Sequence, residues 1–237
     1  MHNYPKINNS FINKVLYTIS IVVSIFLLTQ CRSLQDKLTE GTIEYEIVYT
    51  NNSTQNIPLQ LLPKTMQVKF NHNFVSYTIE DKFGVFSICN IQNLRKQSQI
   101  TLIKLFNKKY VYQAGKKETP VFFSSNIPYK VNFIKDTMRL AGLFCKRASV
   151  IDPQSMKCYD IAYTSNVELK DPNHNTPYKK INGVLMKFEL QMKSLDMMLT
   201  AKKIVQKKID DEDFLLPEEY KFISKKQMEE ILSNLLP

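Results

Sequence analysis

Several residue types on which enzyme sites depend are scarce in this sequence. Its 237 residues include three histidines, five glycines and no tryptophan. The histidines, His2, His72 and His174, lie far apart, and no cysteine or histidine spacing suits zinc. The few glycines form no glycine-rich phosphate loop, and no Gly-x-Ser-x-Gly element is present. We therefore expect no metal site, no cofactor and no catalytic residues, and hence no enzyme.

Cysteine is also rare, and Cys89, Cys145 and Cys158 are the three in the body of the chain. A nucleophilic cysteine needs a nearby base, which so few histidines supply poorly. In an exported protein two of these cysteines can oxidise. A turn centred just after Pro153 places Cys158 opposite Ser149, which argues against a disulfide between Cys145 and Cys158. A bridge between Cys89 and Cys145 stays open.

Basic residues outnumber acidic ones, 32 to 22, which gives a formal net charge of +10. A basic chain favours polyanions, meaning nucleic acid or an anionic membrane surface. The basic residues are spread out in short pairs such as Lys108-Lys109, and no stretch interleaves aromatics with arginines as nucleic-acid platforms do. We therefore expect no nucleic-acid partner. The alternative interpretation of the charge is a solvated, lysine-rich surface.

Residues 1–30 have the pattern of an export signal. Residues 1–14 are polar, carry Lys6 and Lys14 and contain no acid, and residues 15–28 are mostly apolar. A positive segment followed by an apolar one of this length is typical of a secretory signal peptide. A membrane-spanning helix needs about 20 apolar residues, so an uncleaved anchor is the weaker alternative. Removing the two lysines with the signal lowers the net charge to +8.

A cysteine stands where the apolar segment ends, in Leu28-Thr29-Gln30-Cys31. This sequence resembles a bacterial lipobox, although Gln30 stands where a smaller residue is usual. The resemblance implies cleavage before Cys31 and acylation of its thiol and amine, and the alternative is an ordinary signal peptide with a chance cysteine. Each buried methylene of an acyl chain contributes about 0.8 kcal/mol to membrane binding. The polar tether at residues 31–40 lacks an acidic run, which favours the periplasmic side of the outer membrane.

The body of the chain consists of short alternating runs separated by turn sequences. The clearest run, 184–192, has an apolar residue at every even position and mostly polar ones between. Similar runs occupy 42–50, 64–70, 74–80, 84–89, 99–105, 110–113, 129–134, a stretch ending near Ile151, 158–164 and 195–205. Short strands with frequent turns predict a mainly β (α+β) fold, either an antiparallel open β-barrel or a strongly curved sheet. Residues 41–237 form a single β-rich domain in this interpretation.

Two further segments complete the domain. Ser224 and Gln227 form a capping box, and residues 225–235 place apolar side chains on one face, which predicts a short C-terminal helix. Residues 165–181 form a long polar connection, and connections of this length are often functional or mobile.

Five short motifs occur in the order that they have in an uncharacterised family of bacterial envelope lipoproteins. They are Gly-x-Ile-x-Tyr at 41–45, Gly-x-x-Cys-Lys-x-Ala at 142–148, hydrophobic-x-Tyr-Thr at 161–164, Gly-Val and two hydrophobic residues at 183–186, and Phe-x-x-Pro-x-x-Tyr at 214–220. That family is similar to the LolA/LolB-like lipoprotein carrier and receptor fold. The resemblance implies an unclosed antiparallel β-barrel, covered by short helices, with an apolar cavity for acyl chains.

Apolar residues of 184–192 and of the run after it are the candidates for a cavity wall. They are Met186, Phe188, Leu190, Met192 and Met197. Methionine adapts to irregular or variable partners, which suits a lipid cavity. The alternative is that the same residues form an ordinary filled core.

The sequence thus predicts a lipid-anchored, non-catalytic cell-envelope protein, at the outer membrane facing the periplasm, that binds an apolar or lipid ligand. Its expected partners are the membrane, through the N-terminal anchor, and an acyl chain. The competing prediction is a structural or interaction lipoprotein of an envelope complex, with a filled core and no ligand. A cavity in the structure distinguishes the two.

Overall fold

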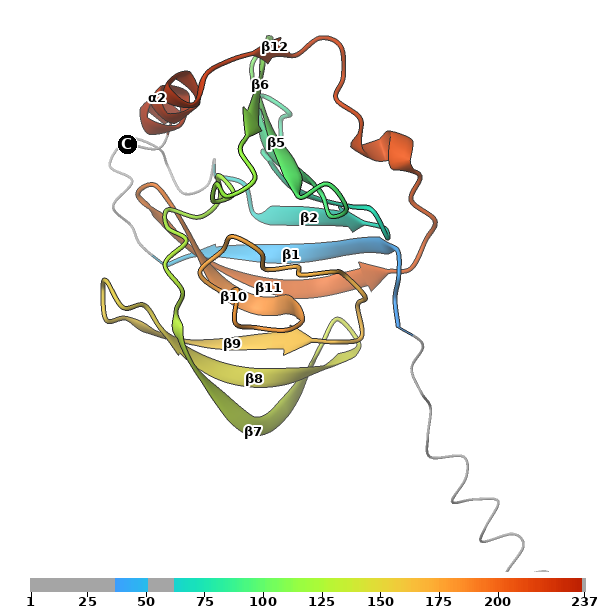
Figure 1. The fold of residues 1–237 in the computed structure, drawn as a ribbon, viewed down its shortest axis with the longest axis vertical. Helices are drawn as coiled ribbons and strands as arrows, with labels where there is room; N and C mark the ends of the chain where they lie inside the picture. The colour runs from blue at the N-terminus through green and yellow to red at the C-terminus, as the bar shows by residue number, and fades with distance from the viewer. Residues whose placement is uncertain (1–36, 51–61, 236–237) are drawn as a thin grey trace, which may run out of the picture. The chain divides into compact units, whose positions relative to one another are not determined.

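The computed structural model describes residues 37–50 and 62–235, which form one 12-stranded sheet with a short C-terminal helix (Figure 1). The elements are β1 (Gly41–Tyr49), β2 (Thr65–Phe70), β3 (Phe74–Glu80), β4 (Phe86–Asn93), β5 (Ser98–Leu105), β6 (Lys108–Ala114), β7 (Lys130–Leu140), β8 (Leu143–Ile151), β9 (Cys158–Thr164), β10 (Val184–Met192), β11 (Leu195–Val205), a 3₁₀ turn (Asp211–Phe214), β12 (Lys221–Phe222) and α2 (Lys225–Leu235).

The strand order is β12-β6-β5-β4-β3-β2-β1-β11-β10-β9-β8-β7. Most neighbours in the sheet are also neighbours in sequence and pair antiparallel, while β12 pairs parallel with β6. The central pairing of β1 with β11 joins the first long strand to the last. The sheet is strongly curved, and its edges β7 and β12 do not meet (Figure 1). The predicted mainly β fold, a curved and unclosed sheet with a short C-terminal helix, is confirmed.

Strand β10 has the bounds that its alternation predicts, because that pattern matches a sheet with one packed face. All five even-numbered residues are buried, while Lys187 and Glu189 are half-buried and Gln191 is exposed. Leu185 is buried too, next to a bulge in the pairing of β10 with β9. Strands β9 and β11 also have their predicted bounds.

The connection between β9 and β10, predicted as a long polar connection, contains residues that are packed into the core. Tyr178 is fully buried, and its hydroxyl donates a hydrogen bond to the backbone oxygen of Glu189 at 2.6 Å. Asn173, also buried, donates to two backbone oxygens of the segment that leads into β10. Val167 pairs with Leu38, so residues before the predicted start at 41 also belong to the folded part. Side-chain anchors of this kind have no periodicity in sequence.

Helix α2 begins at the predicted capping box. The Ser224 backbone amide donates to Oε1 of Gln227 at 2.9 Å, and the Gln227 amide donates to Oγ of Ser224 at 3.3 Å. Met228 and Leu232 are the buried residues of its apolar face. The expected helix is therefore confirmed.

The predicted register of the β8–β9 hairpin is wrong by two residues. Cys158 lies opposite Ile151 rather than Ser149, because the turn spans six residues and is closed by the Asp152 amide donating to the Lys157 oxygen. Oγ of Ser149 nevertheless lies 3.0 Å from Sγ of Cys158, on the diagonal. Cys89, Cys145 and Cys158 are all free thiols in the described part of the chain.

Candidate functional site

An apolar cleft of about 390 Å³ lies at one end of the sheet. At that end β1, β3, β5 and β10 finish and β2, β4 and β11 begin, because antiparallel neighbours run in opposite directions. The cleft lining is Tyr49, Leu62, Pro63, Ile79, Asp81, Phe83, Val85, Phe86, Leu105, Phe106, Met192, Leu195 and Met197. Its volume is within the range of about 300–1,000 Å³ that is usual for small-ligand pockets.

The two polar side chains of the cleft both form hydrogen bonds with backbone groups of the protein. The Tyr49 hydroxyl donates to the backbone oxygen of Pro63 at 2.7 Å, and burial raises the pKa of this hydroxyl. Asp81 accepts hydrogen bonds from the amides of Phe83 and Phe86 at 2.8 and 2.6 Å. Desolvation raises the pKa of Asp81, but these amides outweigh it and hold the pKa below its usual value. The side-chain surface that a ligand can contact in the cleft is therefore mostly hydrocarbon.

Two phenylalanines at hairpin turns stand at the edge of the cleft. Phe83 lies in the β3–β4 turn and Phe106 in the β5–β6 turn, and their exposed fractions are 74% and 69%. Exposed aromatic rings beside an apolar hollow mark binding surfaces more often than isolated exposed residues do. We call Phe83 and Phe106 the rim of the cleft.

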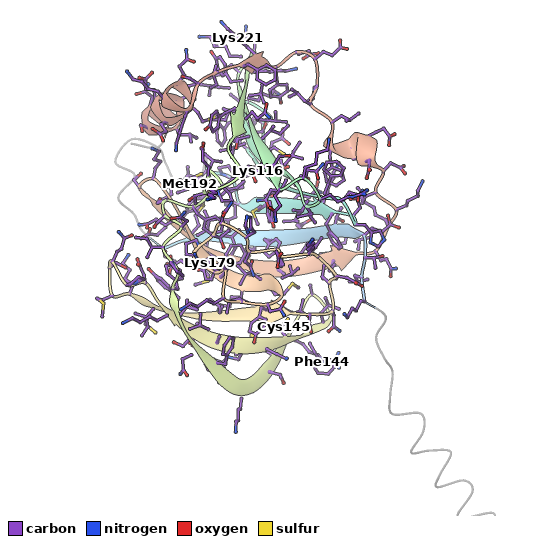
Figure 2. The ribbon with its side chains drawn as sticks, viewed as in Figure 1. Lys116, Phe144, Cys145, Lys179, Met192 and Lys221 are labelled. Carbon is purple, nitrogen blue, oxygen red and sulfur yellow. The ribbon has the colours of Figure 1, made fainter. Side chains whose placement is uncertain are left out.

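The structure places the predicted cavity-wall residues in different environments. Met192 and Met197 line the cleft; Figure 2 labels Met192 at the end of β10. Phe188 and Leu190 line a separate pocket of about 40 Å³ instead. Phe188 packs edge-on against Tyr45 and Tyr178, with ring centroids 5.9 and 6.0 Å apart.

The fifth predicted wall residue, Met186, is fully buried in the main hydrophobic core. That part of the wall is therefore packed against protein side chains, as the filled-core alternative requires. The sequence identified the strand, but it did not show which residues of the strand pack against protein side chains and which line the cleft.

The rim, the turn residue Val85 and Leu105 at the end of β5 were not predicted from sequence as parts of a site. Turn segments carry no hydrophobic periodicity, so an apolar residue there is conspicuous only as an exception to the polar character of turns. Phe83, between Lys82 and Gly84, and Phe106, before Asn107, are such exceptions. These two exposed phenylalanines were the feature of the sequence that could have indicated a cleft at this end of the sheet.

An ionisable cluster at β10 and β11 lies outside the cleft lining. Nζ of Lys157 pairs with Oδ2 of Asp196 at 3.0 Å, and Glu189 accepts a bond from Oγ1 of Thr50 at 3.3 Å. Burial, and then the neighbouring charge of Asp196, raise the pKa of Glu189. The Lys157–Asp196 pair joins the β8–β9 turn to β11, so this cluster connects elements of the fold.

The lipidation candidate Cys31 lies outside the described residues. Within the described part of the chain, no group of three or more His, Cys, Asp or Glu side chains is placed to hold a metal ion. Among the same residues, no helix has the length and apolar character needed to cross a membrane.

No protein-family model and no curated protein matches this chain. Among solved structures it is similar to PNGF-II, with a TM-score of 0.50 and 11% sequence identity. The similarity covers 82% of this chain and 32% of the other, so this chain spans about a third of the length of that protein. A likeness at this identity describes the fold of the sheet and carries nothing about activity.

Proposed function

We propose that this protein is a lipid-anchored cell-envelope protein that binds an apolar ligand, an acyl chain, in the cleft at the end of its sheet, and catalyses no reaction. The observation that carries the proposal is the cleft itself, whose walls are hydrocarbon and whose polar groups are already hydrogen-bonded. Met192 and Met197 adapt to chains of variable shape.

The energetics of burial suit such a ligand. Each methylene moved from water into an apolar site contributes about 0.8 kcal/mol. About ten methylenes therefore contribute roughly 8 kcal/mol before the cost of immobilising the chain, and because that cost is subtracted, micromolar affinity is the upper limit for such a ligand. The rim residues Phe83 and Phe106 add aromatic surface where a chain would enter.

The fold and the absence of tryptophan allow a direct test. Phe106→Trp introduces a single tryptophan at the rim, where its emission reports the polarity of the cleft mouth. The chain from Arg32 onward, which contains every described residue, is titrated with lauric acid. We expect a saturable blue shift of the emission, with half-saturation at micromolar concentration or above, because immobilising the chain costs part of the burial energy.

Phe133→Trp is the matched control, because Phe133 is 58% exposed on β7 and lies outside the cleft lining. Its emission is expected to stay constant. Equal shifts in both variants, or no shift in either together with lipid-free organic extracts of the purified protein, contradict ligand binding. That result favours the second candidate, an interaction lipoprotein with a filled core, which the packing of Met186 and Phe188 supports.

The anchor is proposed at Cys31, holding the protein at the outer membrane on its periplasmic side. Metabolic labelling with a radioactive fatty acid is expected to mark the wild-type protein and to leave Cys31→Ser unlabelled. Cys158→Ser, which removes an exposed thiol of the folded part, is the control and is expected to retain full labelling. Label on the Cys31→Ser protein refutes this anchor.

A further inference from the structure

A polar pocket lies at the other end of β4 and β5 from the apolar cleft. It forms where the β4–β5 turn meets the segment after β6 and the connection between β9 and β10. Its volume is about 40 Å³, several times the roughly 10–15 Å³ that one water requires, so it admits a group of a few atoms.

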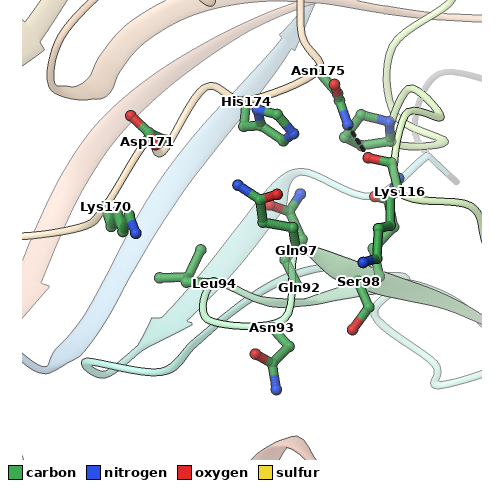
Figure 3. Close-up of a pocket in the computed structure, with 12 residues that line it drawn as sticks. Gln92, Asn93, Leu94, Gln97, Ser98, Lys116, Lys170, Asp171, His174 and Asn175 are labelled. Atoms are coloured by element: carbon green, nitrogen blue, oxygen red, sulfur yellow. Dashed lines mark hydrogen bonds between the residues drawn. The ribbon is translucent and has the colours of Figure 1, made fainter.

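The side chains of the pocket converge from three segments (Figure 3). The amides of Gln92 and Gln97 lie at its centre, facing the ring of His174. Lys116 and Lys170 flank this centre from opposite sides. The lining contains a carboxylate, Asp171, which Figure 3 shows turned away from the centre.

One wall of the pocket is fixed by a hydrogen bond between two of the segments. Nδ2 of Asn175 donates to the backbone oxygen of Lys116 at 2.8 Å, the dashed line in Figure 3. The backbone of the lining is also unusual. Seven described residues other than glycine have positive φ, and Gln97, Asp171 and Asn175 are three of them. Backbone conformations of this kind tend to gather at functional sites.

Several hydrogen-bonding groups of the pocket are unused. Among the described residues, the side chains of Gln97 and His174 have no hydrogen-bond partner, and Lys116 and Lys170 form no ion pair. Most lysines of the described part of the chain form no ion pair, so what sets Lys116 and Lys170 apart is their place on opposite sides of one pocket. Two ammonium groups, an imidazole and an amide thus remain free around one hollow.

We infer that this pocket binds a phosphate group. Two lysines supply positive charge from opposite sides, and amide and imidazole N–H groups donate hydrogen bonds to oxyanion oxygens. A concave site lined by positive charges raises the local concentration of such anions. The lining has no Phe, Tyr or Trp, the rings on which neutral sugars usually stack, which disfavours such a sugar. This site is independent of the apolar cleft and of the proposed acyl ligand.

The scarcity of histidine provides a site-specific readout. The full-length protein, in micelles of an uncharged detergent, is titrated with inorganic phosphate while the histidine ring protons are followed by NMR. His72, in the β2–β3 turn, serves as an internal reference, and substituting His2 and His72 in turn assigns the signals. We expect the His174 signals to shift saturably, with half-saturation at about 1 mM or below, while those of His72 stay fixed.

Charge-matched variants test whether the pocket or the overall charge is responsible. Lys116→Gln with Lys170→Gln is expected to weaken phosphate binding about tenfold, the loss of roughly 1.4 kcal/mol. Lys117→Gln with Lys180→Gln removes the same charge from exposed neighbours outside the lining and is expected to change it less than about twofold. Equal weakening in both pairs, or no shift of His174, overturns the inference.

The source of the phosphate is distinguished by two further titrations, read by the same His174 signals. One uses glycerol phosphate, and the other uses phosphatidylglycerol vesicles in phosphatidylcholine. A shift with glycerol phosphate alone assigns the site to soluble phosphate compounds, and a shift with the vesicles alone assigns it to lipid headgroups. Failure of both, with inorganic phosphate also failing, overturns phosphate recognition without affecting the apolar cleft.

Discussion

Replacing Tyr178 by alanine is expected to lower the free energy of unfolding by about 3–5 kcal/mol, the cost typical of removing a buried aromatic side chain. Tyr178 is fully buried, and its ring contacts those of Phe123, Tyr129 and Phe188. Its hydroxyl also donates to the Glu189 backbone oxygen at 2.6 Å. The substitution therefore leaves a cavity and frees a backbone acceptor of β10.

Two companion variants separate these contributions in urea unfolding followed by circular dichroism. Tyr178→Phe keeps the ring and is expected to cost about 1 kcal/mol, the usual net value of one hydrogen bond. Phe222→Ala removes a ring that is 61% exposed and is expected to cost less than about 0.5 kcal/mol. A Tyr178→Ala protein as stable as Phe222→Ala would show that the connection does not hold the core.

Tyr178 illustrates what the sequence could not show. Strands such as β9, β10 and β11 were predicted with their bounds, because a two-residue alternation is a local property of the chain. The sheet as a whole followed from many such runs. Tyr178 lies among prolines, asparagines and lysines at 171–180, where no period identifies it as core. Its burial depends on long-range packing against β10, and local patterns do not contain that information.

The residues of the candidate site were predictable only where they belong to periodic strands. Met192 and Met197 belong to periodic strands, so they were identified, whereas Phe83 and Phe106 lie in turns and were missed. Phe188 and Leu190 share the face of Met192, yet side chains from the β9–β10 connection and the segment after β6 fill the space against them. A strand pattern specifies which face is buried, and the packing of distant segments decides what that face touches.

A glycine, Gly183, stands directly before β10 in the motif at 183–186, and the structure supplies the physical reason for a glycine there. Gly183 has a φ of +153°, where a side chain is strained. A Cβ added there would lie 2.6 Å from the backbone oxygen of Thr164 and 3.1 Å from the Tyr163 ring. Neither the positive φ nor the close approach of β9 leaves room for any other residue.

Gly183→Ala is therefore expected to destabilise the fold by at least about 3 kcal/mol, from backbone strain together with displacement of β9. Gly142→Ala is the matched control, because Gly142 also has a positive φ, +83°, but has no atom within 4 Å of an added Cβ. Its cost is expected to be about 1–2 kcal/mol, from conformation alone. Urea unfolding of both variants measures the difference, which combines the contact with Thr164 and the difference in backbone strain between a φ of +153° and one of +83°. Equal costs would mean that β9 moves aside freely, and the junction of β9 with β10 would then be soft rather than close-packed.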